Sequence, residues 1–201
     1  MPANPANSAL PDPEFRAFCA VLLAGGRSTR MGRDKAALPW AGGALWEHQL
    51  ATLRATGAGE VCISGPRNGP YATCGLPILE DRTPGTGPLA ALETAFSRAA
   101  YIVVLAIDMP AMGADYLCEL MRAALRNNRS VIPEIESRFE PLAAVYVSAI
   151  APLVEEALRG TEHSMHELVR AALRRDLALT HPVPAESRIL FRNLNTPEDL
   201  I

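Results

Sequence analysis

Short, continuous apolar runs alternate with amphipathic stretches along most of this chain. The first run, Ala17–Leu23, is followed by Gly25-Gly26, and the strongest, Tyr101–Ile107, is rich in β-branched residues and ends at Asp108. A parallel strand that is buried on both faces has this continuous pattern. Further strands are expected at Val61–Ser64, Pro77–Glu80, Ser130–Pro133, Leu142–Val147 and Arg188–Phe191. Apolar residues at helical spacing lie between these runs, around Trp46–Leu53, Leu89–Phe96, Leu117–Ala124, Ile150–Leu158 and Ser164–Arg174.

This alternation predicts a single three-layer α/β domain of Rossmann-like type, with a mostly parallel sheet and helices on both faces. The 201 residues suffice for one domain with a substantial core. Residues 1–15 contain four prolines and no periodic pattern, so we expect a disordered N-terminal lead followed by a domain over residues 16–201. Ligands of such folds bind beyond the carboxyl ends of the strands. The polar residues that directly follow the strands are therefore the candidates for function.

Composition excludes several classes of protein. The longest apolar run, Ala17–Ala24, is too short to span a membrane. A net charge of −3 and 5% aromatic residues give no overall reason to bind nucleic acid. The start of the chain does not resemble a signal peptide, and the four cysteines are scattered without a C-x-x-C pair. We therefore expect a cytoplasmic protein without a zinc site or disulfide framework and, since no exposed apolar stripe is evident, a monomer.

The loop after the first strand is locally cationic. Residues 23–35 read L-A-G-G-R-S-T-R-M-G-R-D-K, which places four cations against one acid. Glycines that allow a close backbone approach, followed by cations, suit a polyphosphate. A glycine turn followed by a solvated basic loop is the alternative interpretation. The P-loop pattern and the G-x-G-x-x-G dinucleotide fingerprint are both absent from this segment.

This loop resembles the L-A-G-G-x-x-x-R-M-G-x-D-K signature of the nucleotidyltransferases, and most of all the molybdenum cofactor guanylyltransferases. Three further segments are similar to motifs of that family, in the same order: Glu80-Asp81 with Gly85–Ala90, Asp108-Met109-Pro110, and Asn193–Glu198. The resemblance therefore extends from residue 23 to the end of the chain. It implies transfer of GMP from GTP to the terminal phosphate of molybdopterin, with release of pyrophosphate and dependence on Mg²⁺. Transient contact with other proteins of cofactor biosynthesis is also implied.

The resemblance also implies roles for the matching residues. Arg30 and Lys35 would be catalytic, holding the β- and γ-phosphates and offsetting the charge of the departing pyrophosphate. Asp108 would be catalytic as a Mg²⁺ ligand, and Asn195 would be a second ligand. The implied GTP-binding set comprises Leu23, Ala24, Gly25, Gly26, Lys35, Ser64, Asp81, Gly87 and Asp108.

Simpler interpretations exist for four of these positions. Asp108 could cap a helix, Asp81 could be a surface turn acid, and Asn195 could be a turn residue. Gly87-Pro88 is also an ordinary helix start.

Two alternative functions stay open. One is another nucleotidyltransferase of the same fold that uses CTP or a sugar phosphate, because Ser64-Gly65 stands where the guanylyl branch often has Asn. The other is a non-catalytic nucleotide-binding module.

Overall fold

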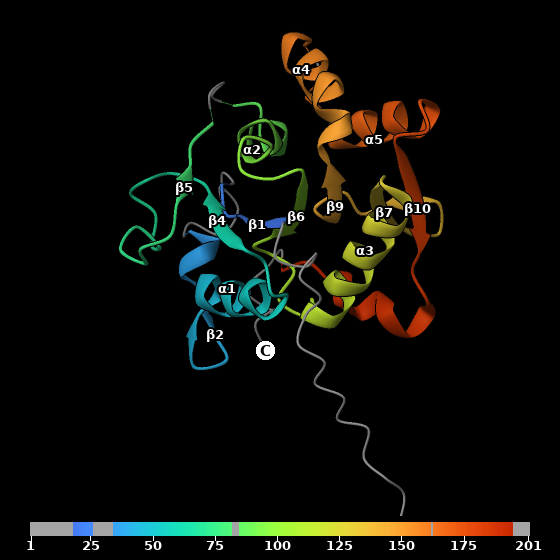
Figure 1. The fold of residues 1–201 in the computed structure, drawn as a ribbon. Coiled ribbons are helices and arrows are strands. Elements are labelled where there is room, and N and C mark those ends of the chain that lie inside the picture. Colours follow the sequence, from blue (N-terminus) through green and yellow to red (C-terminus); the bar gives the residue numbers. More distant parts are fainter. Residues whose placement is uncertain (1–17, 26–33, 82–84, 162, 195–201) are drawn as a thin grey trace, which may run out of the picture.

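An eight-stranded sheet runs through the centre of the computed structural model, which describes residues 18–25, 34–81, 85–161 and 163–194 (Figure 1). The strands lie in the order β10-β7-β9-β6-β1-β4-β5, and β8 pairs with β7. Their bounds are β1 Phe18–Leu23, β4 Glu60–Ser64, β5 Ile78–Leu79, β6 Tyr101–Ala106, β7 Ser130–Ile135, β8 Arg138–Phe139, β9 Ala143–Val147 and β10 Ala178–Pro182. A separate two-stranded hairpin consists of β2 Pro39–Trp40 and β3 Gly43–Ala44.

The sheet is mostly parallel, as predicted. Strands β5, β4, β1 and β6 are parallel neighbours, and β10 is parallel to β7. Strand β9 lies antiparallel to both β6 and β7 and so makes the sheet mixed. The carboxyl ends of β1, β4, β5 and β6 therefore meet at one edge of the sheet.

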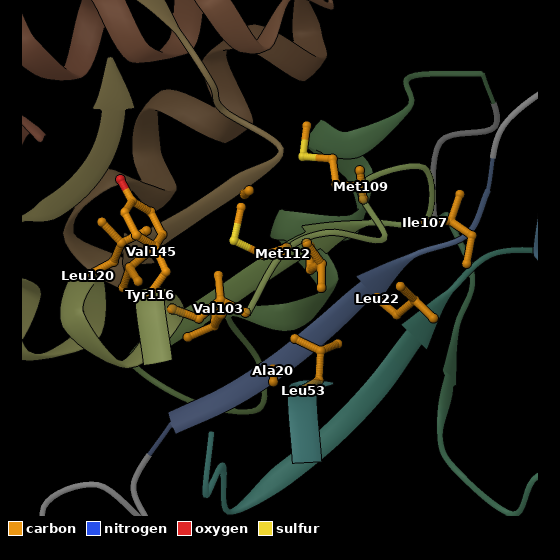
Figure 2. Packing of buried hydrophobic residues seen from close by; sticks show 14 of the residues in the cluster. Ala20, Leu22, Leu53, Val103, Ile107, Met109, Met112, Tyr116, Leu120 and Val145 are labelled. Atoms are coloured by element: carbon orange, nitrogen blue, oxygen red, sulfur yellow. The ribbon is translucent and has the colours of Figure 1, made fainter. Parts of the chain in front are cut away.

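Helices cover both faces of the sheet. Their bounds are α1 Leu45–Ala55, α2 Pro88–Ala95, α3 Ala114–Asn127, α4 Ala151–Arg159 and α5 Met165–Arg174, with 3₁₀ turns η2 Lys35–Ala37, η3 Ser148–Ile150 and η4 Ala185–Phe191. Side chains of β1 alternate between two cores, because successive residues of a strand point to opposite faces. Ala20 and Leu22 pack with α1 and α3, whereas Cys19 and Val21 pack with α2, α4 and α5. Figure 2 shows the first of these cores around Ala20, Leu22 and Leu53.

The carboxyl-terminal part differs from the sequence prediction. The expected strand Arg188–Phe191 is wrong, because these residues belong to η4, while β10 was not predicted at all. Within the run Arg188–Phe191, Phe191 inserts into the core, where its ring lies edge-on to Tyr116 with centroids 5.4 Å apart, whereas Ile189 is 58% exposed. The sequence Thr196-Pro197-Glu198-Asp199 predicts a helix start, and both this segment and the predicted N-terminal lead lie outside the described residues. None of the helices in the described part of the chain could cross a membrane.

Just past the end of β4, the surrounding atoms leave no room for a side chain at Gly65. A Cβ atom on Gly65 would lie 2.0 Å from the Tyr71 hydroxyl oxygen and 3.2 Å from the Gly25 nitrogen. Tyr71 is fully buried, so its ring cannot move aside cheaply. The Tyr71 hydroxyl and the Gly25 backbone thus account for glycine at position 65.

Gly65→Ala is therefore expected to lower the free energy of unfolding by about 1–3 kcal/mol, measured by urea denaturation. Gly113→Ala is the matched control, since a Cβ there meets no atom within 4 Å, and it should change stability by less than about 0.5 kcal/mol. Tyr71→Phe should restore part of the loss in Gly65→Ala by removing the clashing hydroxyl. Equal stability of Gly65→Ala and Gly113→Ala would contradict the predicted clash between a Cβ at residue 65 and Tyr71.

Candidate nucleotide site

A cleft of about 800 Å³ opens at the carboxyl ends of β1, β4 and β5. It is bordered by the residues that follow these strands and by the start of α2. The lining comprises Leu23, Gly25, Ser64, Gly65, Pro66, Glu80, Asp81, Gly85, Gly87 and Pro88. Five residues of the predicted GTP-binding set thus lie around one cavity, within the usual size range of a small-molecule site.

A smaller hollow of about 220 Å³ continues from this cleft across the end of β1 toward β6. It shares Leu23, Gly25 and Pro88 with the cleft. Its lining comprises Leu23, Ala24, Gly25, Asp34, Lys35, Pro88, Ala106, Ile107, Asp108 and Leu142. The predicted residues Lys35 and Asp108 therefore lie in the same hollow, although they are far apart in the sequence.

Lys35 and Asp108 face each other in this hollow. The Lys35 ammonium lies 3.3 Å from Asp108 Oδ2 and donates a 2.6 Å hydrogen bond to the Leu194 carbonyl. The side chains of Lys35 and Asp108 are 18% and 26% exposed, so the pair is partly shielded yet open to a ligand. Asp34 caps the turn η2 by accepting a hydrogen bond from the Ala36 amide, which fixes the backbone that carries Lys35.

The closing segment of the chain completes this arrangement. The Leu194 amide donates a 2.8 Å hydrogen bond to the Asp108 carbonyl, and Leu194 is 3% exposed. Its carbonyl and amide thus bond to Lys35 and Asp108 respectively. Residues from both ends of the described chain meet at the site.

Asp81 and the start of α2 border the larger cleft. Burial raises the pKa of the Asp81 carboxyl above its ordinary value. Gly87 precedes α2 with φ of 61°, a conformation that glycine adopts without strain, and Pro88 occupies the first turn of α2. The first turn of a helix presents unpaired backbone N–H groups, which favour a negatively charged ligand.

Three predicted site residues, Gly26, Arg30 and Asn195, lie outside the described residues. Their roles stay predictions. The described neighbours Gly25, Asp34 and Leu194 all lie at the site.

Two residues that bond to the backbone around Asp108 were not predicted from the sequence. Gln49 of α1 is fully buried, and its amide nitrogen lies 3.0 Å from the carbonyl oxygens of Ala106 and Met109. His48 Nε2 lies 2.9 Å from the Pro110 carbonyl. Gln49 stands one helical turn after Leu45 and one before Leu53, in the buried stripe of α1. The sequence signal that could have indicated Gln49 was a polar residue within an otherwise apolar helical stripe.

Cys19 and Cys62 lie in contact on neighbouring strands, which the sequence spacing did not indicate. Their Sγ atoms are 3.7 Å apart, and a Glu60 carboxylate oxygen lies within 4.8 Å of both. The hydrogen bond with Cys62, together with burial, raises the pKa of the Cys19 thiol. Glu60 is already paired with Arg98 at 2.9 Å. We therefore interpret this pair as thiols packed in the second core.

The fold and the cleft define an α/β nucleotidyltransferase. Residues 20–178 match the MobA-like NTP transferase domain, and the chain belongs to this family. A probable molybdenum cofactor guanylyltransferase from Opitutus terrae is 37% identical over 188 residues, covering 91% of this chain and 93% of the relative. A protein of the same name from Mycobacterium tuberculosis is 36% identical, covering 85% and 89%.

Solved structures agree with this assignment. The crystal structure of molybdopterin-guanine dinucleotide biosynthesis protein A from Archaeoglobus fulgidus has a TM-score of 0.75 and 26% identity, covering 91% of this chain and 94% of that one. The 2-C-methyl-D-erythritol 4-phosphate cytidylyltransferase from Thermus thermophilus has a TM-score of 0.64 and 20% identity, covering 90% and 94%. The second likeness shows a shared fold only. The predicted family and fold class are confirmed.

Proposed function

We propose that the protein transfers GMP from GTP to the terminal phosphate of molybdopterin and releases pyrophosphate. The observation that carries the proposal is the pairing of Lys35 and Asp108 at 3.3 Å, beside the cleft that β1, β4 and β5 border. A cation and a carboxylate at the sheet edge suit the transfer of a nucleotidyl group, which depends mainly on positioning and charge neutralisation. The names of the relatives support GTP and molybdopterin as the substrates.

In the proposed reaction, an oxygen of the acceptor phosphate forms a bond to the α-phosphorus of GTP. The bond from the α-phosphorus to the bridging oxygen of the β-phosphate breaks, and that oxygen leaves with pyrophosphate. The acceptor oxygen is already anionic at neutral pH, so the step needs no strong general base. Lys35 would stabilise the negative charge that develops on the leaving oxygen.

The donor set at the site fits Mg²⁺. Asp108 offers a carboxylate, an oxygen ligand of the type that Mg²⁺ prefers, and one or two protein carboxylates suffice because water and substrate phosphates complete the coordination. When bound, Mg²⁺ would neutralise phosphate charge and polarise the α-phosphate. Asp108 would hold it, with Asn195 as the proposed second ligand. Arg30 would assist Lys35 at the β- and γ-phosphates.

The larger cleft would hold the nucleoside. The Asp81 carboxylate accepts hydrogen bonds when ionised, which complements the donor N–H groups on the edge of guanine. Leu23, Ala24, Gly25 and Gly26 would line the base and ribose with backbone groups, and Ser64 would replace the Asn of related enzymes. The first turn of α2, opened by Gly87, would face a carbonyl edge of the base or an anionic group. Monomeric state, cytoplasmic localisation and transient contact with other biosynthetic proteins belong to this proposal.

Pyrophosphate release from GTP, CTP, ATP and UTP, with and without molybdopterin, tests the function. We expect release from GTP only, and only when molybdopterin and Mg²⁺ are present. Faster release from CTP would indicate a cytidylyltransferase instead. Tight binding of GTP without release under any condition would indicate a binding module.

A further inference from the structure

The side-chain amide of Gln49 bonds to the backbone on both sides of Asp108. Its nitrogen lies 3.0 Å from the Ala106 carbonyl oxygen, 3.0 Å from that of Met109 and 3.5 Å from that of Ile107. A primary amide has two hydrogens, so it can donate fully to the two nearer oxygens. Gln49 thereby ties the last residue of β6 to the residue that follows Asp108.

Neighbouring contacts hold the rest of the turn formed by residues 106–110. Nε2 of His48, on the same helix, must carry the hydrogen, because its partner at 2.9 Å is the Pro110 carbonyl oxygen. The Asp108 carbonyl accepts a hydrogen bond from the Leu194 amide. Ile107 and Met109 flank Asp108 and belong to the core that α1 and α3 cover (Figure 2). Backbone groups on each side of Asp108 are thus fixed, while its own carboxylate stays partly exposed.

Core packing alone does not explain a glutamine at this position. Gln49 is 0% exposed, and its Oε1 atom has no hydrogen-bond partner among the described residues. A buried acceptor without a partner destabilises a fold, and methionine would fill a similar volume without that penalty. Methionine lacks the N–H donors of the amide, so the two hydrogen bonds to the backbone are what glutamine adds at this position.

We propose that Gln49 and His48 are positioning residues that hold residues 106–110 so that the Asp108 carboxylate faces Lys35. The inference deepens the proposed function, since it assigns how Asp108 is oriented for metal and triphosphate. Neither side chain lines the cleft or the hollow, and both act through the backbone of the turn. Displacement of a reacting group by about 1 Å can lower a rate by about 100-fold.

The test uses Gln49→Met and two readouts. Pyrophosphate release should show kcat lowered about 10–100-fold with KM for GTP changed by less than about threefold, because the nucleoside cleft is untouched. Electron paramagnetic resonance of Mn²⁺, added alone and with GTP, should show metal affinity weakened about tenfold. His48→Phe, which keeps a ring beside Trp40, should change both quantities in the same direction by a smaller factor.

Leu53→Ala is the matched control, because Leu53 is equally buried on α1 but does not bond to the turn. It should lose stability and keep Mn²⁺ affinity when assayed below its melting temperature. The inference is overturned if Gln49→Met keeps kcat and Mn²⁺ affinity within about twofold of the wild type. It is also overturned if Leu53→Ala lowers kcat and Mn²⁺ affinity as much as Gln49→Met does. If Gln49→Met does not fold, unchanged kcat and Mn²⁺ affinity in His48→Phe overturn it. A wild-type protein without transfer, whose Mn²⁺ affinity still depends on Gln49, would refute the proposed function and support the inference.

Discussion

Asp108→Asn is expected to lower kcat for pyrophosphate release by about 10³-fold. The substitution keeps the shape of the side chain and removes its negative charge, and a neutral amide is a far weaker ligand for Mg²⁺. Lys35 can still donate to the remaining oxygen, so the fold should lose no more than about 1 kcal/mol of stability. Initial rates measured across a Mg²⁺ titration should show both a lower maximum and a higher half-saturating concentration.

Asp115→Asn serves as the control for this prediction. Asp115 is an exposed acid in the first turn of α3, close in sequence but absent from the lining of both cavities. It should keep wild-type turnover and Mg²⁺ dependence. Turnover of Asp108→Asn within about tenfold of the wild type would show that Asp108 does not hold the metal.

The order of strands and helices could be predicted because the central strands are covered on both faces. β1 and β6 lie in the middle of the sheet, so their sequences are continuous apolar runs. The edge strand β10 gives no such signal, because three of its five residues are half-buried and it ends at Pro182. The opposite error arose at Arg188–Phe191, because three consecutive apolar residues resemble a strand although they lie in a 3₁₀ turn with Ile189 exposed and Phe191 buried.

The grouping of the site residues could also be predicted, from topology. Parallel strands bring their carboxyl ends to one edge, so the residues after β1, β5 and β6 had to lie near one another. Which atoms pair could not be predicted in this way. The bonds of Leu194 to Lys35 and Asp108 depend on how the chain returns to the sheet after η4. The carbonyl oxygens to which the Gln49 amide donates are determined by the rotation of α1 about its axis.

Lys35 is the only lysine in the chain, and all the other cationic side chains apart from histidine are arginines. A sequence so biased toward arginine would be expected to carry arginine here too, if any cation sufficed. The geometry gives a reason for lysine: the ammonium fits between the Asp108 carboxylate at 3.3 Å and the Leu194 carbonyl at 2.6 Å in a largely enclosed position. A guanidinium is planar and larger, so it cannot occupy the same point.

Lys35→Met and Lys35→Arg are therefore both expected to impair turnover. Lys35→Met should lower kcat about 10²–10³-fold, because the ammonium that would stabilise the charge on the leaving oxygen of pyrophosphate is then lost. Lys35→Arg should recover only a small part of this loss. Although Lys35→Met should lower kcat, it should raise the affinity of the nucleotide-free protein for Mn²⁺ about fivefold, since the ammonium no longer competes for Asp108.

The single lysine also permits a chemical test without mutation. An amine-selective acylating reagent can modify the protein at Lys35 and the N-terminal amine alone, and intact-mass and peptide mass spectrometry separate the two sites. Acylation of Lys35 should remove turnover in proportion to its extent, and GTP with Mg²⁺ should slow it by occupying the hollow. Arg54→Met, which removes an exposed cation at the end of α1, controls for net charge and should leave turnover unchanged. Full turnover after complete acylation of Lys35 would show that its charge takes no part in the reaction, and the assignment of the triphosphate to this hollow would fail with it.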